Sequence, residues 1–144
     1  MTTVRIKLLT PTAKAPSYAT DGSAGMDLFS DAADFILWPG QQVKIGTGLA
    51  MEIPIGFEGQ VRPRSGWTDK HGITVANSPG TVDADFRGEV CVMLIHNGNR
   101  DITIKRGDRI AQLVISPVER ARIEVAAELS DTARGAGGFG STGR

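Results

Sequence analysis

The sequence lacks most features of disulfide-stabilised, membrane-bound or nucleic-acid-binding proteins. Its 144 residues include a single cysteine, Cys91, which excludes an internal disulfide framework and a cysteine-based metal cluster. The 16 basic and 16 acidic residues cancel, so no overall charge attracts nucleic acid or an anionic membrane. No apolar run approaches the roughly 18–20 residues that span a bilayer. We therefore expect one cytoplasmic domain with no nucleic-acid or membrane partner.

Glycine is the residue type in excess, with 18 of the 144 residues, against a usual share of about 7%. Gly or Pro separates short apolar segments, a pattern typical of strands joined by tight turns. The segments expected to be strands are Val4–Leu8, Phe35–Trp38, Gln42–Ile53, Phe57–Arg62, Ile73–Ala76, Glu89–His96, Ile102–Lys105, Ile110–Ser116 and Arg122–Ala126. One short helix is expected to begin near Ser65 and end before Gly72. The pattern predicts an all-β sandwich, jelly roll or barrel.

The start of the expected helix has residues suited to binding an anion. Ser65 is a good N-cap residue, and the N–H groups of Gly66 and Trp67 would point out of the helix start. Arg64 adds a guanidinium that can pair with a phosphate through two N–H groups. An ordinary capped helix beside a surface arginine explains the same residues, so the motif alone leaves both interpretations open.

The segment from Gly80 to Gly88 is predicted to form a hairpin tip between the strands expected at 73–76 and 89–96. In an extended segment Asp83 and Asp85 would project from one face. A carboxylate there could act as general base toward a water or orient a metal-bound water. Phe86 is an unusual ring for a polar tip and could stack on a ligand. A solvated aspartate-rich turn is the alternative.

Several polar or reactive residues lie within apolar segments. Asp27, between Met26 and Leu28, needs a partner for its charge. Gln112 could bond a phosphate oxygen or satisfy a backbone group. The histidines at 71 and 96 lack metal-ligand spacing and are interpreted as structural or surface residues. Cys91 lies among apolar residues, which favours a buried, inert thiol.

The C-terminal residues 134–144 contain five glycines and cannot form a regular element unaided. We therefore expect a β domain at 1–133 and a flexible arm at 134–144. The arm also carries a ring, two hydroxyls and two guanidiniums: Phe139, Ser141, Thr142, Arg134 and Arg144. These groups suit a segment that orders over a phosphorylated, ring-bearing ligand. A disordered terminus is the other interpretation.

Taken together and in this order, these segments resemble the motifs of the homotrimeric dUTPase (deoxyuridine 5'-triphosphate nucleotidohydrolase) family. The matching segments are 24–30, 63–66, 80–88, 106–112 and 134–142, which span nearly the whole chain. Five motifs in order at these spacings are highly specific. The resemblance implies a jelly-roll-like β-sandwich of the dUTPase β-clip type, with one short helix and a flexible glycine-rich arm, in agreement with the expected strands.

The resemblance also implies an activity and an assembly. The family hydrolyses dUTP to dUMP and pyrophosphate with Mg2+, which limits uracil in DNA and supplies dUMP for thymidylate synthesis. Asp83 matches the catalytic aspartate that activates the water attacking the α-phosphate. Asp27 matches the aspartate near the water shell of the metal, an indirect metal contact. Each site in this family combines segments from three subunits, so a homotrimer with shared active sites is implied.

The substrate-binding residues are implied in the same way. Phe86 stands where the family usually has tyrosine, whose ring packs on the deoxyribose and leaves no room for a 2′-hydroxyl. Asn77 and the hairpin backbone would line the uracil pocket, and Phe139 matches the arm aromatic that stacks on uracil. The other implied substrate-binding positions are Arg64, Ser65, Gly66, Val82, Gln112, Arg134, Gly140, Ser141 and Thr142. Trp67-Thr68 replaces the usual Leu-Ala pair.

Two alternatives remain for the function. A dCTP deaminase shares this fold and a similar hairpin, but its chemistry calls for a carboxylate on the strand after the hairpin, and residues 90–96 contain none. A dUTPase-like regulatory protein without catalysis is the second alternative. The presence of Asp83, Ser65, Gln112 and the complete arm argues against it.

Overall fold

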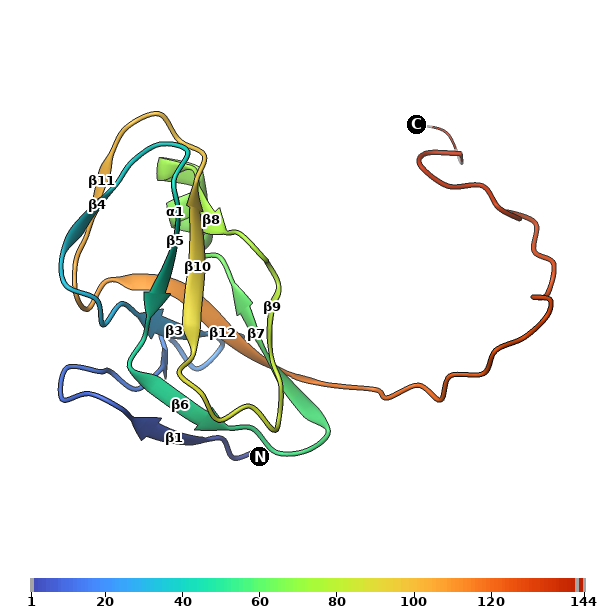
Figure 1. The fold of residues 1–144 in the computed structure, drawn as a ribbon, viewed down its shortest axis with the longest axis horizontal. Helices are drawn as coiled ribbons and strands as arrows, with labels where there is room; N and C mark the ends of the chain where they lie inside the picture. The colour runs from blue at the N-terminus through green and yellow to red at the C-terminus, as the bar shows by residue number, and fades with distance from the viewer. Residues whose placement is uncertain (1, 142, 144) are drawn as a thin grey trace.

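The computed structural model of the chain describes residues 2–141 and 143, and within them it consists of short strands and one helix (Figure 1). The elements are β1 (Arg5–Leu8), β2 (Ser17–Tyr18), β3 (Met26–Phe29), β4 (Phe35–Leu37), β5 (Gln42–Gly46), β6 (Leu49–Glu52), β7 (Phe57–Arg62), α1 (Ser65–His71), β8 (Ile73–Val75), β9 (Gly80–Val82), β10 (Cys91–His96), β11 (Ile102–Ile104) and β12 (Arg109–Pro117). The predicted all-β class with one short helix is confirmed. No described helix has the length and apolar character needed to cross a membrane.

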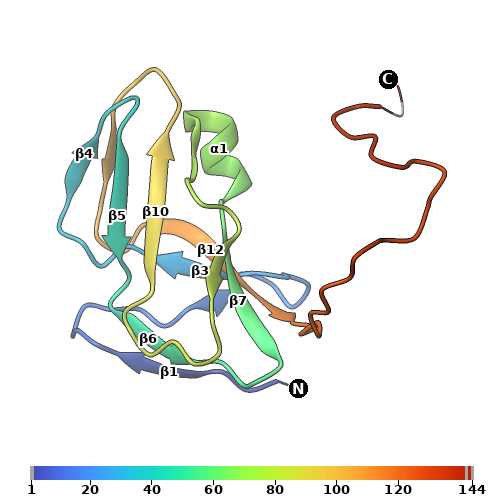
Figure 2. The ribbon, with the colours of Figure 1, turned by 45° about the vertical axis from the view of Figure 1, so that its right-hand side comes forward.

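The strands form small antiparallel sheets around one core. The largest has the order β2-β3-β12-β7-β9, a second has the order β5-β10-β8, and β1-β6 and β4-β11 are pairs. Figure 2 shows β5 and β10 upright, with β3 and β12 crossing below them and β1 and β6 at the base. Strands β8 and β10 are hydrogen-bonded neighbours in one sheet, but the chain between them contributes β9 to the large sheet. This crossing between sheets gives the jelly-roll-like sandwich that the sequence predicted.

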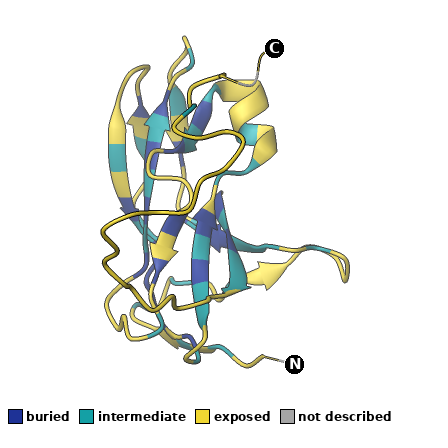
Figure 3. Ribbon diagram, turned by 90° about the vertical axis from the view of Figure 1, so that its right-hand side faces the viewer, coloured by how far each residue is buried: buried dark blue, intermediate teal, exposed yellow. Residues whose placement is uncertain are grey.

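Strands of every sheet contribute buried residues to the core, and in several strands the buried positions alternate. In β10 the side chains of Val92, Leu94 and His96 are buried, while the residues between them are partly exposed. Leu28 of β3 and Leu113 of β12 are completely buried in the same cluster. Burying one such leucine contributes about 1.5–3 kcal/mol. Figure 3 shows that the buried positions lie on the strands, whereas the C-terminal segment is exposed along its length.

Two of the predicted strands differ from the structure. The segment expected as one strand at 42–53 is two, β5 and β6, because the chain turns at Gly48, which has a φ of 67°. Strand β5 then pairs with β10, and β6 pairs with β1. The strand expected at 122–126 is wrong: the described residues after Pro117 form no strand, and Ile123 and Val125 are exposed. Apolar and polar residues do alternate at 122–126, but no sheet formed by the described residues packs against this segment.

Candidate active site

Helix α1 spans Ser65–His71, as predicted, but its N-cap residue lies one position earlier than predicted. The Arg64 carbonyl accepts hydrogen bonds from the N–H groups of Trp67 (3.0 Å) and Thr68 (3.1 Å), so Arg64 is the N-cap residue, and its side chain makes no capping bond. The prediction of Ser65 as N-cap is therefore wrong, and Ser65 is the first helical residue. An added Cβ at Gly66 would meet no atom within 4 Å, so the helix start is open to a ligand.

Asp27 has the partners that its apolar surroundings require. Its Oδ1 lies 3.2 Å from Arg64 Nε, and its Oδ2 lies 3.2 Å from Nη1 of Arg109. The carboxylate comes from β3, one guanidinium from β12 and the other from the residue that caps α1. Its side chain is only 15% exposed. The ion pairs thus fix the helix start against the large sheet, and both carboxylate oxygens are engaged.

Gln112 lies beside the same helix start. It is paired in register with Asp27 of β3 and with Arg62 of β7. Its Nε2 donates a hydrogen bond to the Pro63 carbonyl at 3.0 Å, one residue before the cap of α1. An added Cβ at Gly25 would lie 2.5 Å from Gln112 Oε1, so a larger residue at position 25 would displace this amide. Of the two interpretations of Gln112, the structure shows the bond to backbone, and the second N–H of Nε2 remains for a ligand.

A pocket of about 300 Å³ gathers the residues predicted around the hairpin. Asn77, Val82, Asp83 and Phe86 all line it. The Asn77 amide lies against Gly80, whose Cβ, if added, would be 3.1 Å from Nδ2. The structure therefore brings together four residues that were predicted to bind or act on one ligand.

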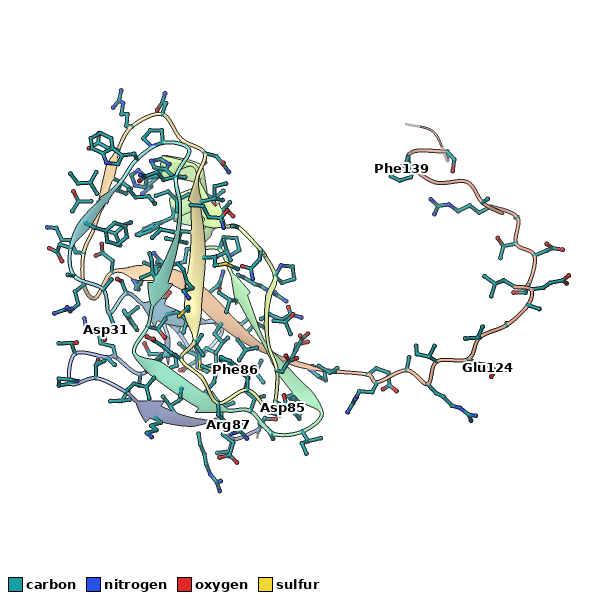
Figure 4. All side chains as sticks on the ribbon, in the orientation of Figure 1. Asp31, Asp85, Phe86, Arg87, Glu124 and Phe139 are labelled. Carbon is teal, nitrogen blue, oxygen red and sulfur yellow. The ribbon has the colours of Figure 1, made fainter. Side chains whose placement is uncertain are left out.

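The segment from Asp83 to Phe86 is a turn rather than an extended strand. The Phe86 N–H donates to the Asp83 carbonyl at 3.1 Å, which closes a turn over residues 83–86. The prediction that Asp83 and Asp85 share one face of an extended segment is therefore wrong. Asp83 and Phe86, at the two ends of the turn, line the 300 Å³ pocket, whereas Asp85 lines a larger cavity of about 840 Å³. Asp83 borders both. Figure 4 labels Asp85 and Phe86 on this turn, near the base of the body.

The pocket residues that sequence reasoning missed include Cys91 and Met93, which line it from β10. The strand alternates buried and partly exposed positions, so the thiol is partly exposed and the predicted full burial is wrong. Partial burial, followed by the nearby Glu89 carboxylate, raises the pKa of the Cys91 thiol, and Lys44 opposes them. The thiol is thereby kept protonated and inert at neutral pH. The alternation along β10 was the signal that places both residues on the side opposite the core.

The two histidines have the structural or surface character that was predicted. His96 is buried, with Nδ1 accepting the Gly98 N–H at 3.1 Å and Nε2 lying 2.7 Å from the Arg100 carbonyl. His71 is exposed in the last turn of α1. Among the described residues no group of three or more His, Cys, Asp or Glu side chains could hold a metal ion.

The arm lies away from the pocket of its own chain. Phe139 is fully exposed, and Figure 4 shows it far from Phe86. The described residues of the arm make only local hydrogen bonds, among them those from Arg134 Nε to the Gly137 carbonyl (2.8 Å) and from the Ser141 N–H to the Gly138 carbonyl (3.0 Å). Gly140 has a φ of 88°. Thr142 lies outside the described residues. The structure thus does not bring the predicted arm residues to the other site residues.

Comparisons with known proteins agree on one family. The family model described as dUTPase matches residues 12–143. The deoxyuridine 5'-triphosphate nucleotidohydrolase of Nautilia profundicola is 55% identical over 141 residues, covering 98% of this chain and 99% of the relative. The enzyme of the same name from Desulfotalea psychrophila is 57% identical over 135 residues, covering 93% and 90%.

Solved structures show the same fold. A variant of the Staphylococcus bacteriophage 80alpha dUTPase with dUpNHpp superimposes with a TM-score of 0.89 at 28% identity and covers 99% of both chains. A variant of the dUTPase from phage phi11 of S. aureus, described as coordinating a structural Mg(II) ion, has a TM-score of 0.80 at 26% identity and covers 88% of this chain and 97% of that one.

Proposed function

The chain belongs to the dUTPase family, and from this premise we propose that it hydrolyses dUTP to dUMP and pyrophosphate. The observation that carries the proposal is the pocket in which a carboxylate, Asp83, and a ring, Phe86, stand at the two ends of one turn. A pocket with few, convergent polar groups and an aromatic wall is suited to a nucleoside. The high identity to the nucleotidohydrolases named above supports dUTP as the substrate.

Asp83 is the catalytic residue in this proposal. Its carboxylate accepts a proton from a water molecule as the water oxygen bonds to the α-phosphorus. The bond from that phosphorus to the oxygen bridging to the β-phosphate breaks, and pyrophosphate leaves with the bridging oxygen. The exposed position of Asp83 at the pocket edge suits this role, since water can reach the carboxylate.

The phosphates are bound at the start of α1. The free N–H groups of Ser65 and Gly66, with the Arg64 guanidinium and the Gln112 amide, form a donor set directed at an anion. The residues also fit Mg2+ in an indirect way. Because both oxygens of Asp27 are paired with arginines, Asp27 would accept hydrogen bonds from metal-bound waters rather than ligate the ion. Bound on the triphosphate, Mg2+ supplies charge neutralisation.

The base and the sugar occupy the 300 Å³ pocket. Asn77 and Val82 line the part of it that receives uracil, and Phe86 presents its ring to the deoxyribose, where it excludes a 2′-hydroxyl. The ring is 42% exposed in the chain alone, so a ligand can cover the remainder.

The arm completes the site from another copy of the chain. Residues 134–144, beyond the β domain at 1–133, close over the pocket, with Phe139 stacking on uracil and Arg134, Gly140, Ser141 and Thr142 reaching the phosphates. The support is the course of the chain after β12, which leaves the body and holds Phe139 of the arm far from its own pocket (Figure 4). This arrangement supports sites shared between the subunits of a homotrimer.

The test is incubation with dUTP and Mg2+ and measurement of pyrophosphate for the wild type, Asp83→Asn and Asp85→Asn. General-base catalysis is worth about 10²–10⁴-fold, so Asp83→Asn should lose that much turnover. Asp85→Asn is the matched control, because it changes a carboxylate of the same turn that faces the other cavity, and it should stay within about threefold. No pyrophosphate from the wild type, or full activity of Asp83→Asn, would overturn the proposal. Ammonia release from dCTP would favour a deaminase instead.

A further inference from the structure

We propose that Arg87 is a positioning residue that fixes the turn carrying Asp83 and Phe86, an inference that rests on the proposed function. Its guanidinium Nη1 donates to the carbonyl of Ala84 at 2.7 Å and to the carbonyl of Phe86 at 2.9 Å. Both acceptors belong to the turn that the bond between the Phe86 N–H and the Asp83 carbonyl closes.

The turn needs such support because it has little of its own. One backbone hydrogen bond closes it, and Asp83, Asp85 and Phe86 are exposed. Exposed turns with few contacts open readily and locally. Hydrogen bonds from a charged donor are roughly twice as strong as neutral ones, so two bonds from one guanidinium restrict the turn considerably. Without them the carboxylate of Asp83 would be free to move relative to the pocket.

Arg87 acts from the side of the turn opposite the proposed ligand. It lines the 840 Å³ cavity together with Asp85, whereas Phe86 lines the 300 Å³ pocket, and Asp83 lies between the two. On the ligand side, the ring of Phe86 covers Gly88, since an added Cβ at Gly88 would lie 2.7 Å from the ring Cζ. The ring of Phe86 therefore contacts the segment on the ligand side, and the guanidinium of Arg87 binds the turn from the opposite side. Arg87 has no need to touch the substrate to affect the reaction.

The experiment compares Arg87→Ala and Arg87→Lys with the wild type, using Arg5→Ala as the matched control. Arg5 is an exposed arginine on β1 that pairs with Glu52. Displacement of a catalytic group by about 1 Å costs on the order of 100-fold. We expect Arg87→Ala to lower kcat for dUTP by about 10- to 100-fold with KM within about threefold of the wild type. Arg87→Lys should be intermediate, because an ammonium can satisfy one of the two carbonyls.

Two further measurements separate positioning from a general loss of structure. Millimolar methylguanidinium should restore part of the kcat of Arg87→Ala and leave Arg5→Ala unchanged. Amide hydrogen exchange without substrate should be faster for residues 84–86 in Arg87→Ala while exchange in β10 stays unchanged.

The outcomes distinguish failure of the inference from failure of the function. Unchanged kcat in Arg87→Ala overturns the inference, as does a raised KM with normal kcat, which would indicate a substrate contact. Unchanged exchange at residues 84–86 overturns it as well. If the wild type released no pyrophosphate from dUTP, the proposed function would fail, and the exchange result would still decide whether Arg87 holds the turn.

Discussion

The body of the molecule and its C-terminal arm place the same kinds of residue in opposite environments. Leu28 in the body is completely buried, whereas Leu129, in the segment that leads from β12 to the arm, is 89% exposed. Phe86 packs against Gly88 beside the pocket, whereas Phe139 contacts nothing comparable. The body therefore positions its site residues through its own core, and the arm carries residues that only a ligand or another copy of the chain can position.

This difference has an energetic consequence for the proposed reaction. Ordering a flexible segment costs about 1–2 kcal/mol per residue for the backbone, and glycine loses the most freedom. The arm has five glycines within residues 134–144, so closure is unfavourable until a bound triphosphate and base supply contacts. An arm of this kind orders over the correct ligand and opens again for product release.

The largest effect should come from removing the arm. Deleting residues 134–144 should lower turnover of dUTP by about 100-fold or more, because the site loses its stacking ring and several phosphate donors. The unfolding temperature and the proposed trimer should be unchanged, since none of the described arm residues belongs to the core. Pyrophosphate release, calorimetry and light scattering measure the three quantities. An unaffected rate would remove the arm from the site.

Mixing two inactive variants shows whose arm closes over whose pocket. Copies that lack residues 134–144 retain Asp83, and Asp83→Asn copies retain the arm. If subunits share sites, unfolding and refolding the two variants together should recover activity, whereas each variant alone stays inactive. No recovery from mixed trimers would mean that each arm serves its own chain.

A matched pair of leucines sharpens the comparison in stability. Leu28→Ala should lower the free energy of unfolding by about 2–5 kcal/mol, because it removes buried methyl groups and leaves a cavity. Leu129→Ala should stay within about 0.5 kcal/mol in the isolated chain, because its side chain is exposed. Urea denaturation of both variants measures the difference. A large loss in Leu129→Ala at concentrations where the chain assembles would show that the segment before the arm packs on a neighbouring copy.

The same contrast explains which features of the fold the sequence could predict. Local signals were sufficient where the chain itself provides the partner: the alternation of β10, and the glycine at 72 whose φ of 68° ends α1. The strand expected at 122–126 failed because alternation says which side chains share a face but not whether a sheet is present to receive them. Strand β9 was missed because Gly80–Val82 opens the segment that was predicted to be a hairpin tip, and its partner β7 lies about 20 residues earlier in the chain.

The candidate site also has features that could be predicted from the sequence and features that could not. Residue types and spacing predicted that Asp27 needs a charged partner, but the identity of its partners, Arg64 and Arg109, depends on the register of β3 with β12. The N-cap at Arg64 rather than Ser65 also follows from tertiary contacts, because the Asp27 ion pair holds Arg64 at the helix start. The contacts of Arg87 were not predicted, because nothing in the sequence of a polar turn indicates which carbonyls an arginine will bind.

The smallest effect is expected for Phe86→Tyr, where the body already holds the ring in place. Exclusion of a single hydroxyl by an apolar wall is worth about 100-fold, and the ring, packed over Gly88, supplies that wall with or without its own hydroxyl. The ratio of kcat/KM for dUTP to that for UTP should therefore change by less than about threefold. Phe86→Ala is the control and should lose most of the discrimination. If the wild type hydrolyses UTP far better than Phe86→Tyr does, the ring alone does not select the sugar, and a bond from the tyrosine hydroxyl is required.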